Sequence, residues 1–216
     1  MSSREKTIQS GLITPRTVQA HCTFLDGPSL RSLYENGTAV AHCPLSNTYF
    51  SAKPFPLREA LQQGVKVGLG TDIAGGYSLD MMNAMRQAVA VSRMRQGEHA
   101  IAGNEGNLAI DWKEALYLGT VGGAKSLGLA TGIFDIGSPF DAQQSKSPTI
   151  LESKLMVSTV RLFDAETGSG LGVLDFLDLE FDGGTRRLCE DMIEKWWCLG
   201  DSLNRLDVWV QGVSIM

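Results

Sequence analysis

The chain has 216 residues, 43% of them hydrophobic and 7% aromatic, which suits one large domain or a domain with a smaller satellite. Its formal net charge is −5 and its Lys and Arg residues are scattered, so we expect no nucleic-acid partner. Residues 1–10 lack the apolar core of a signal peptide, and no stretch approaches the roughly 18 apolar residues of a membrane span. We therefore expect a cytoplasmic protein without a membrane partner.

Three short apolar runs near the start of the chain have the composition of buried parallel strands: residues 17–20, 38–41 and 65–69. Helical patterns lie between them, over residues 29–36 and 57–63, and a glycine directly follows each pattern. This alternation predicts right-handed βαβ units in an α/β fold. Periodicity does not separate a closed barrel from a doubly wound sheet.

A longer helix is predicted after the third strand, with Ser78 as its N-cap. Six residues recur at helical spacing and predict its buried face: Met81, Met82, Met85, Ala88, Val89 and Ser92. Asp111 and Glu114 form a capping-box pattern that predicts a helix over residues 112–120, and another helix is expected over residues 124–127. These patterns indicate core packing.

The last third of the chain has a different composition. Gly- and Pro-containing turns and the acidic, Gly-rich stretch 164–184 predict loops and short strands. A helix is predicted over residues 186–199, and alternation over residues 206–213 predicts a strand. We therefore predict an α/β domain over residues 11–130 and a small β-rich satellite over residues 131–216.

The four cysteines are too widely spaced for a CxxC metal site: Cys22, Cys43, Cys189 and Cys198. Disulfides are rare in a reducing cytoplasm. We predict that these residues are small buried hydrophobic side chains.

Polar residues follow the three predicted strands. His21 and His42 come at the ends of the first two, and Asp72 follows the third. Because the carboxyl ends of parallel strands open onto one face, these side chains are expected around one crevice. Imidazole and carboxylate suit zinc, but a catalytic zinc needs three protein ligands, so this set is partial. The competing interpretation is that each histidine is a hydrogen-bonded core residue.

A doubly wound ligand-binding domain is the alternative without hydrolytic chemistry, and it would need a phosphate-binding loop. The Gly68-Leu69-Gly70 segment has Ile73 where a third glycine is required. Ala124 likewise stands where a Walker loop has glycine before lysine. The sequence therefore disfavours nucleotide-loop chemistry.

Two motifs carry a resemblance to a known family. Residues 41–47 (AHCPLSN) and 68–76 (GLGTDIAGG) closely resemble the guanine deaminase family of the amidohydrolase superfamily, and the second motif is the more specific. Further similarity occurs at residues 122–129, 140–142, 199–201 and 208–212. Residues 143–184 match least well.

The resemblance implies an α/β fold of the TIM-type (β/α)₈ class, with one zinc ion that serves the hydrolysis of guanine to xanthine and ammonia. Residues 11–130 would then be part of an amidohydrolase barrel containing its sixth to eighth strands. The family resemblance also implies a homodimer.

The same resemblance implies roles for single residues. Asp72 would be the zinc ligand at the end of the eighth strand, would shuttle a proton to and from the attacking water, and would contact the substrate. His21, at the end of the sixth strand, would orient that water and contact the purine. His42 and Asn47 would have structural or pocket-wall roles in the seventh strand and its loop.

The family's other metal-binding histidines, its proton-shuttling glutamate and its purine-binding arginine would all precede residue 1. The Zn²⁺ site of this chain is therefore expected to be incomplete, and the isolated chain is expected to be inactive. The expected partners are guanine and either a second copy or a missing N-terminal half. The alternative function is a non-catalytic half-barrel that binds a partner through its exposed sheet edges.

Overall fold

The structure is a computed structural model, and it describes residues 11–145, 153–155, 158–160, 184–200 and 205–216. The chain divides into two compact units, Met1–Gly132 and Ile133–Met216. Within the described ranges, no helix has the length and apolar character needed to cross a membrane.

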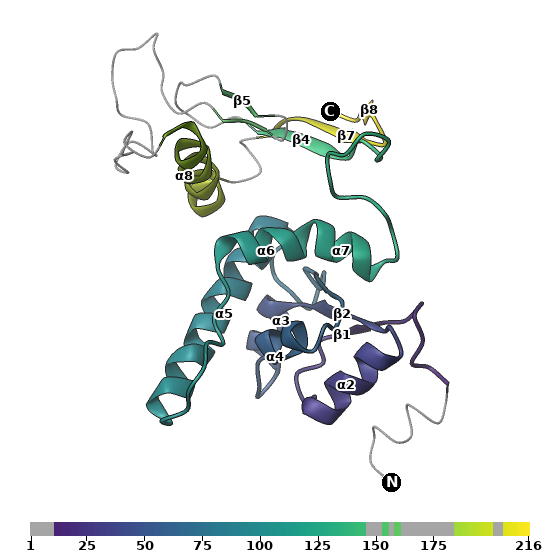
Figure 1. The fold of residues 1–216 in the computed structure, drawn as a ribbon, viewed down its shortest axis with the longest axis vertical. Helices are drawn as coiled ribbons and strands as arrows, with labels where there is room; N and C mark the ends of the chain where they lie inside the picture. Colours follow the sequence, from purple (N-terminus) through teal and green to yellow (C-terminus); the bar gives the residue numbers. More distant parts are fainter. Residues whose placement is uncertain (1–10, 146–152, 156–157, 161–183, 201–204) are drawn as a thin grey trace. The chain divides into compact units, whose positions relative to one another are not determined.

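A three-stranded parallel sheet in the order β1-β2-β3 forms the centre of the first unit (Figure 1). Its strands are β1 (Val18–Ala20), β2 (Ala39–His42) and β3 (Val67–Leu69), which confirms the three predicted strands. Val40 pairs with Gln19 on one side and with Val67 on the other, and it is 0% exposed. The middle strand is therefore the most deeply buried.

Three helices connect these strands: α2 (Gly27–Glu35), α3 (Pro44–Phe50) and α4 (Leu57–Gln62). α2 and α4 confirm predicted helices. α2 begins at Asp26, whose carboxylate accepts a hydrogen bond from the backbone N–H of Ser29 at 2.9 Å. α3 was not predicted, because Cys43 makes no side-chain cap and the helix has only seven residues. The available signal was Pro44 at its first position.

After β3 the chain forms α5 (Met81–Ile101), α6 (Trp112–Gly119) and α7 (Val121–Ser126). The predicted N-cap of α5 was wrong: Asp80, not Ser78, accepts a hydrogen bond from the N–H of Met82, at 3.0 Å. The reason is that Ser78 Oγ accepts instead from the N–H of Asp80, the residue directly before the helix. Asp111 and Glu114 form the predicted capping box at the start of α6.

The predicted apolar stripe of α5 is largely buried. Four of its six residues are buried: Met82, Met85, Ala88 and Ser92. The other two, Met81 and Val89, are partly exposed. Ser92 is polar, but its hydroxyl accepts a hydrogen bond from the N–H of Ile110 at 3.0 Å. This bond anchors the segment before α6 against α5.

Glycines allow α7 to lie directly on β3. A Cβ atom on Gly68 would be 2.9 Å from the Cα of Gly123, and one on Gly122 would be 2.8 Å from the carbonyl oxygen of Val67. Side chains at these positions would separate the helix from the strand. The absence of a side chain at Gly68 and Gly122 therefore allows the close approach of the two backbones.

Two arginines connect α4 to the later helices. Arg58 makes two hydrogen bonds to the carboxylate of Glu114, at 2.7 and 2.9 Å. Arg95 makes two to the carboxylate of Glu59, at 2.6 and 3.0 Å. Such bidentate pairs fix orientation as well as charge, so α5 and α6 are held against α4.

The second unit is mainly antiparallel. β4 (Ala142–Ser145), β7 (Arg205–Val210) and β8 (Val213–Ser214) form one sheet, and β5 (Ser153–Leu155) pairs with β6 (Ser158–Val160). Its helix, α8 (Gly184–Leu199), confirms the predicted one. The predicted strand over residues 206–213 is divided into β7 and β8 by a turn with positive φ at Gln211 and Gly212. The loops predicted over 164–184 lie almost wholly outside the described residues.

The cysteines are only partly as expected. Cys43 is buried and Cys22 is partly buried, but Cys198 is exposed, which contradicts the prediction. The reason is its position on α8, where Trp197 beside it is the residue that faces inward, at 7% exposure. The side chain of Cys189 lies outside the described residues.

Candidate functional site

His21 lies immediately beyond the end of β1. Its backbone N–H still donates to the carbonyl of Ala41 at 3.0 Å, but His21 and Cys22 then adopt positive φ angles of 66° and 53°. Non-glycine residues adopt this left-handed conformation at a cost, and they often do so at functional sites. The chain therefore turns sharply away from the sheet directly after His21.

Asp72 lies in the turn after β3. Gly70 keeps the strand pairing by donating from its N–H to the carbonyl of His42 at 2.9 Å, and Asp72 then has φ 50°. A Cβ atom on Gly75 would overlap the Asp72 carboxylate, and one on Gly76 would overlap the carbonyl of Thr71. The two glycines therefore allow the loop to close around the aspartate.

His21 and Asp72 face each other at one edge of the sheet. The imidazole Nε2 of His21 is 3.8 Å from Oδ2 of Asp72, and the two side chains are 45% and 32% exposed. They are within reach of solvent and of each other. The predicted convergence of the strand ends is confirmed for this pair.

His42 lies close by but belongs to the core. It is 2% exposed, and its ring centroid is 5.1 Å from that of Phe55. Burial, helped by the positive charges of Arg95 and His21, lowers the pKa of His42 to about 3. His42 is therefore a neutral, buried imidazole, so the core interpretation holds for His42 but not for the partly exposed His21.

Asn47 joins the two histidines. Its Oδ1 is 2.8 Å from Nδ1 of His21, and its Nδ2 is 3.3 Å from Nδ1 of His42. Asn47 is on α3 and is 3% exposed. Sequence reasoning assigned it only a structural or pocket-wall role, because the helix that carries it was not recognised.

The cysteines near this edge are unsuited to nucleophilic chemistry. Burial, reinforced by the charge of Asp72, raises the pKa of the Cys43 thiol to about 11. Burial raises the pKa of the Cys22 thiol to about 11 as well. Because the thiolate is the reactive form, both residues are inert thiols at neutral pH.

The donor atoms of this edge fit zinc in kind but not in number. Two ligands of a tetrahedral zinc ion lie roughly 3.4 Å apart, from metal–ligand distances of about 2.0–2.1 Å. The 3.8 Å between His21 and Asp72 is near that value. Across the part of the chain that the structure describes, no three His, Cys, Asp or Glu side chains gather to hold a metal. The pair can form only part of a site.

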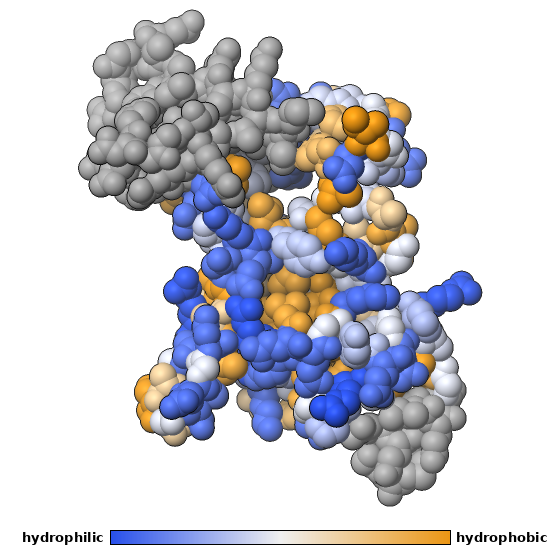
Figure 2. All heavy atoms as spheres, in the orientation of Figure 1, coloured by the Kyte–Doolittle hydropathy of each residue, from blue (hydrophilic) through white to orange (hydrophobic). Residues whose placement is uncertain are grey.

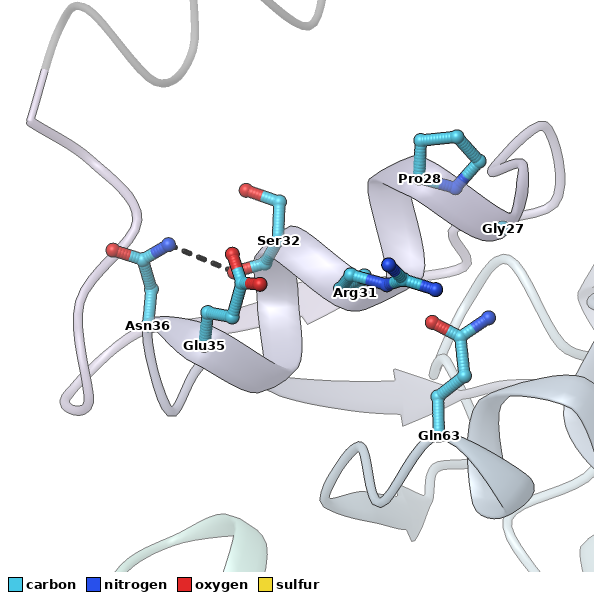
Figure 3. Close-up of a pocket in the computed structure, with 7 residues that line it drawn as sticks. All are labelled: Gly27, Pro28, Arg31, Ser32, Glu35, Asn36 and Gln63. Atoms are coloured by element: carbon cyan, nitrogen blue, oxygen red, sulfur yellow. Dashed lines mark hydrogen bonds between the residues drawn. The ribbon is translucent and has the colours of Figure 1, made fainter.

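An open depression elsewhere on the first unit is a weaker candidate. It lies between α2 and the end of α4, and residues of both line it: Gly27, Pro28, Arg31, Ser32, Glu35, Asn36 and Gln63 (Figure 3). The hydrogen bond drawn there joins the Asn36 amide to the carbonyl of Ser32 at 2.8 Å. The lining does not include His21, His42, Asn47 or Asp72.

Comparison with known proteins gives the chain a family and relatives. Residues 2–160 match the Amidohydrolase family. The chain is 34% identical to the guanine deaminase of Homo sapiens over 210 residues, which is 96% of this chain and 40% of that protein. The chain therefore spans about 40% of the length of this curated relative.

Solved structures give the same result. The chain superposes on E. coli guanine deaminase with a TM-score of 0.68 at 28% identity, covering 97% of this chain and 40% of that one. A C. acetobutylicum guanine deaminase with bound guanine gives a TM-score of 0.69 at 24% identity, covering 98% and 42%. An adenosine deaminase from Xanthomonas campestris with bound zinc gives 0.63 at 22% identity, covering 97% and 39%. The last two show likeness of fold.

Proposed function

The chain belongs to the amidohydrolase family, and from that membership we propose that it carries one part of an active site for the hydrolytic deamination of guanine to xanthine and ammonia. One observation carries this proposal: His21 Nε2 and Asp72 Oδ2 lie 3.8 Å apart at one sheet edge. Both residues lie within the stretch that is similar to the human guanine deaminase, where 210 residues align at 34% identity.

The three parallel strands supply the geometry for this role. We assign β1, β2 and β3 to the sixth, seventh and eighth strands of a (β/α)₈ barrel. In such barrels the reacting groups come from the carboxyl ends of different strands. His21 and Asp72 have that position, because His21 directly follows β1 and Asp72 lies in the turn after β3 of the same sheet.

The reaction requires a base that later acts as an acid. A water oxygen forms a bond to the ring carbon that carries the amino group, the carbon–nitrogen bond breaks, and the nitrogen leaves as ammonia. Asp72 takes the proton of the attacking water and returns it to the departing nitrogen. His21 accepts a hydrogen bond from the water at Nε2 and fixes its direction of attack. Both residues are exposed enough to reach a bound purine.

Zinc is part of the proposal, since Asp72 and His21 are suitable donor types. Asp72 would provide one ligand, and the bound ion would supply Lewis-acid activation of the water. The other ligands would come from polypeptide equivalent to the part of the relatives that this chain does not cover. The isolated 216-residue chain should therefore neither retain zinc in a 1:1 ratio nor turn over guanine.

Complementation tests the proposal. Zinc content and ammonia release from guanine are measured for the chain alone and after refolding with the segment of human guanine deaminase that this chain does not match. Zinc binding and turnover that require both pieces support the proposal. One tightly held zinc per isolated chain, together with turnover, would overturn the incomplete site. Stable association without turnover would overturn the catalytic assignment.

The second candidate is a non-catalytic half-barrel that binds a partner. β1 and β3 are the outer strands of their sheet, and apolar side chains around it are exposed, such as Val18 at 41% and Ile73 at 71%. Figure 2 shows an apolar area framed by polar residues on one face of the first unit. Open edges and apolar patches favour association. Association with the complementary segment but without turnover would support this candidate.

A further inference from the structure

The amide of Asn47 lies between two imidazoles, and its two ends differ in whether they donate or accept a hydrogen bond. An amide oxygen can only accept a hydrogen bond and an amide nitrogen can only donate one. Oδ1 of Asn47 is 2.8 Å from Nδ1 of His21, so that nitrogen carries the proton. Nδ2 of Asn47 is 3.3 Å from Nδ1 of His42, so that nitrogen accepts. In the neutral rings, the proton of His42 is then on Nε2.

Burial keeps the His42 ring neutral, so one of its nitrogens can accept a hydrogen bond. His42 is 2% exposed, and its pKa, lowered to about 3 mainly by burial, keeps the ring neutral at physiological pH. Asn47 is itself 3% exposed, so water does not compete for its amide. Because an unpaired buried amide is unfavourable, Asn47 keeps a hydrogen bond to each imidazole.

We infer that Asn47 is a positioning residue: it holds His21 in the tautomer that carries its proton on Nδ1 and presents the Nε2 lone pair to Asp72. The geometry stands by itself, whereas the catalytic meaning rests on the proposed function. Which ring nitrogen of a histidine is protonated is set by the hydrogen bond that the other nitrogen makes.

The distance between His21 and Asp72 agrees with this tautomer. At 3.8 Å, Nε2 and Oδ2 are too far apart for a direct hydrogen bond. Two acceptors facing each other can share a proton donor or a cation between them. The opposite amide orientation would place a proton on Nε2, and His21 would lose its ability to accept from the attacking water.

Nitrogen NMR of the complete chain tests this directly. The sequence has three histidines, so long-range ¹H–¹⁵N spectra of the chain labelled at histidine can be fully assigned. At pH 8 the expected result is His21 mainly as the Nδ1–H form and His42 mainly as the Nε2–H form. His21 observed mainly as the Nε2–H form would overturn the inference, even if no variant could be produced.

Two variants separate the hydrogen bond from Asn47 to His21 from the one to His42. Asn47→Leu removes both hydrogen bonds, and His21 should then shift mainly to the Nε2–H form. Asn47→Asp keeps an acceptor for His21 but cannot donate to His42, so His21 should keep its tautomer while His42 moves its proton to Nδ1. Asn36→Asp is the matched control, because Asn36 is an exposed asparagine at the C-cap of α2. An unchanged His21 in Asn47→Leu would overturn the inference.

These spectra need neither zinc nor guanine. Loss of the expected tautomers would therefore refute the role of Asn47, while failure of the complementation assay would refute the proposed function and leave the tautomers unaffected.

Discussion

The ends of β1 and β2 have nearly the same sequence and very different surroundings. Residues 18–22 read VQAHC and residues 39–43 read AVAHC. The histidine side chain after β1 is 45% exposed and 3.8 Å from a carboxylate, whereas the histidine that ends β2 is 2% exposed and contacts Phe55. β1 is an outer strand of its sheet and β2 is the central one.

The comparison shows that position in the sheet, and not the local motif, decides what a histidine does. The edge strand leaves its histidine accessible to solvent. The central strand surrounds its histidine with neighbours, and burial then removes its charge. Asn47 connects the two, so the buried histidine can support the exposed one.

The largest expected effect tests whether Asp72, the carboxylate that faces the exposed His21, takes part in catalysis. Asp72→Asn keeps the shape of the carboxylate that faces His21 but removes its charge and its ability to take a proton. In the complemented protein, guanine turnover should fall roughly 10²–10⁴-fold. Asp135→Asn, an exposed aspartate, is the control and should change turnover less than twofold. Equal losses in both variants would contradict the assignment.

The second prediction compares the two histidines by stability. His42→Ala removes a buried ring and leaves the amide of Asn47 without an acceptor, so the free energy of unfolding should fall by about 3 kcal/mol. His21→Ala alters a side chain that is 45% exposed and should lower it by less than about 1 kcal/mol. Urea unfolding measures both, and similar losses would refute the division into core and site.

The pH dependence of stability sharpens the same contrast. The pKa of His42 falls from 6.5 in the unfolded chain to about 3 in the folded one, so the unfolded state binds the extra proton between these values. The contribution of neutral His42 to the free energy of unfolding is complete above pH 6.5 and is lost as pH falls toward 3. From pH 7 to pH 5 the protein should lose about 2 kcal/mol that His42→Phe does not lose. Parallel pH profiles of the two proteins would show that His42 is not buried in neutral form.

The smallest expected effect concerns the support of Asp72. Gly75→Ala would place a methyl group against the Asp72 carboxylate, and turnover of the complemented protein should fall about tenfold because that group must move. Gly97→Ala is the matched control, since nothing lies within 4 Å of its Cβ position. Gly97 is inside α5, so alanine there should stabilise the protein by about 0.5–1 kcal/mol. Full activity of Gly75→Ala would show that the carboxylate position is not critical.

The sequence alone determined much of the first unit. Apolar runs of strand length, helical spacing and terminal glycines located β1, β2 and β3 with most of their connecting helices, because these features act over a few residues. The same reasoning placed His21, His42 and Asp72 at a common edge, since parallel strands end on the same side.

Only the tertiary structure decided which histidine is exposed, that Asn47 connects the two, and that Asp80 rather than Ser78 begins α5. Each depends on neighbours that are distant in sequence or on a choice between two competent caps, and local patterns carry no information about either. Burial of His42 comes from strands on both sides of β2 and from Phe55. The physical reason is that desolvation is a property of the assembled surroundings, so identical Ala-His-Cys endings acquire different chemistry once folded.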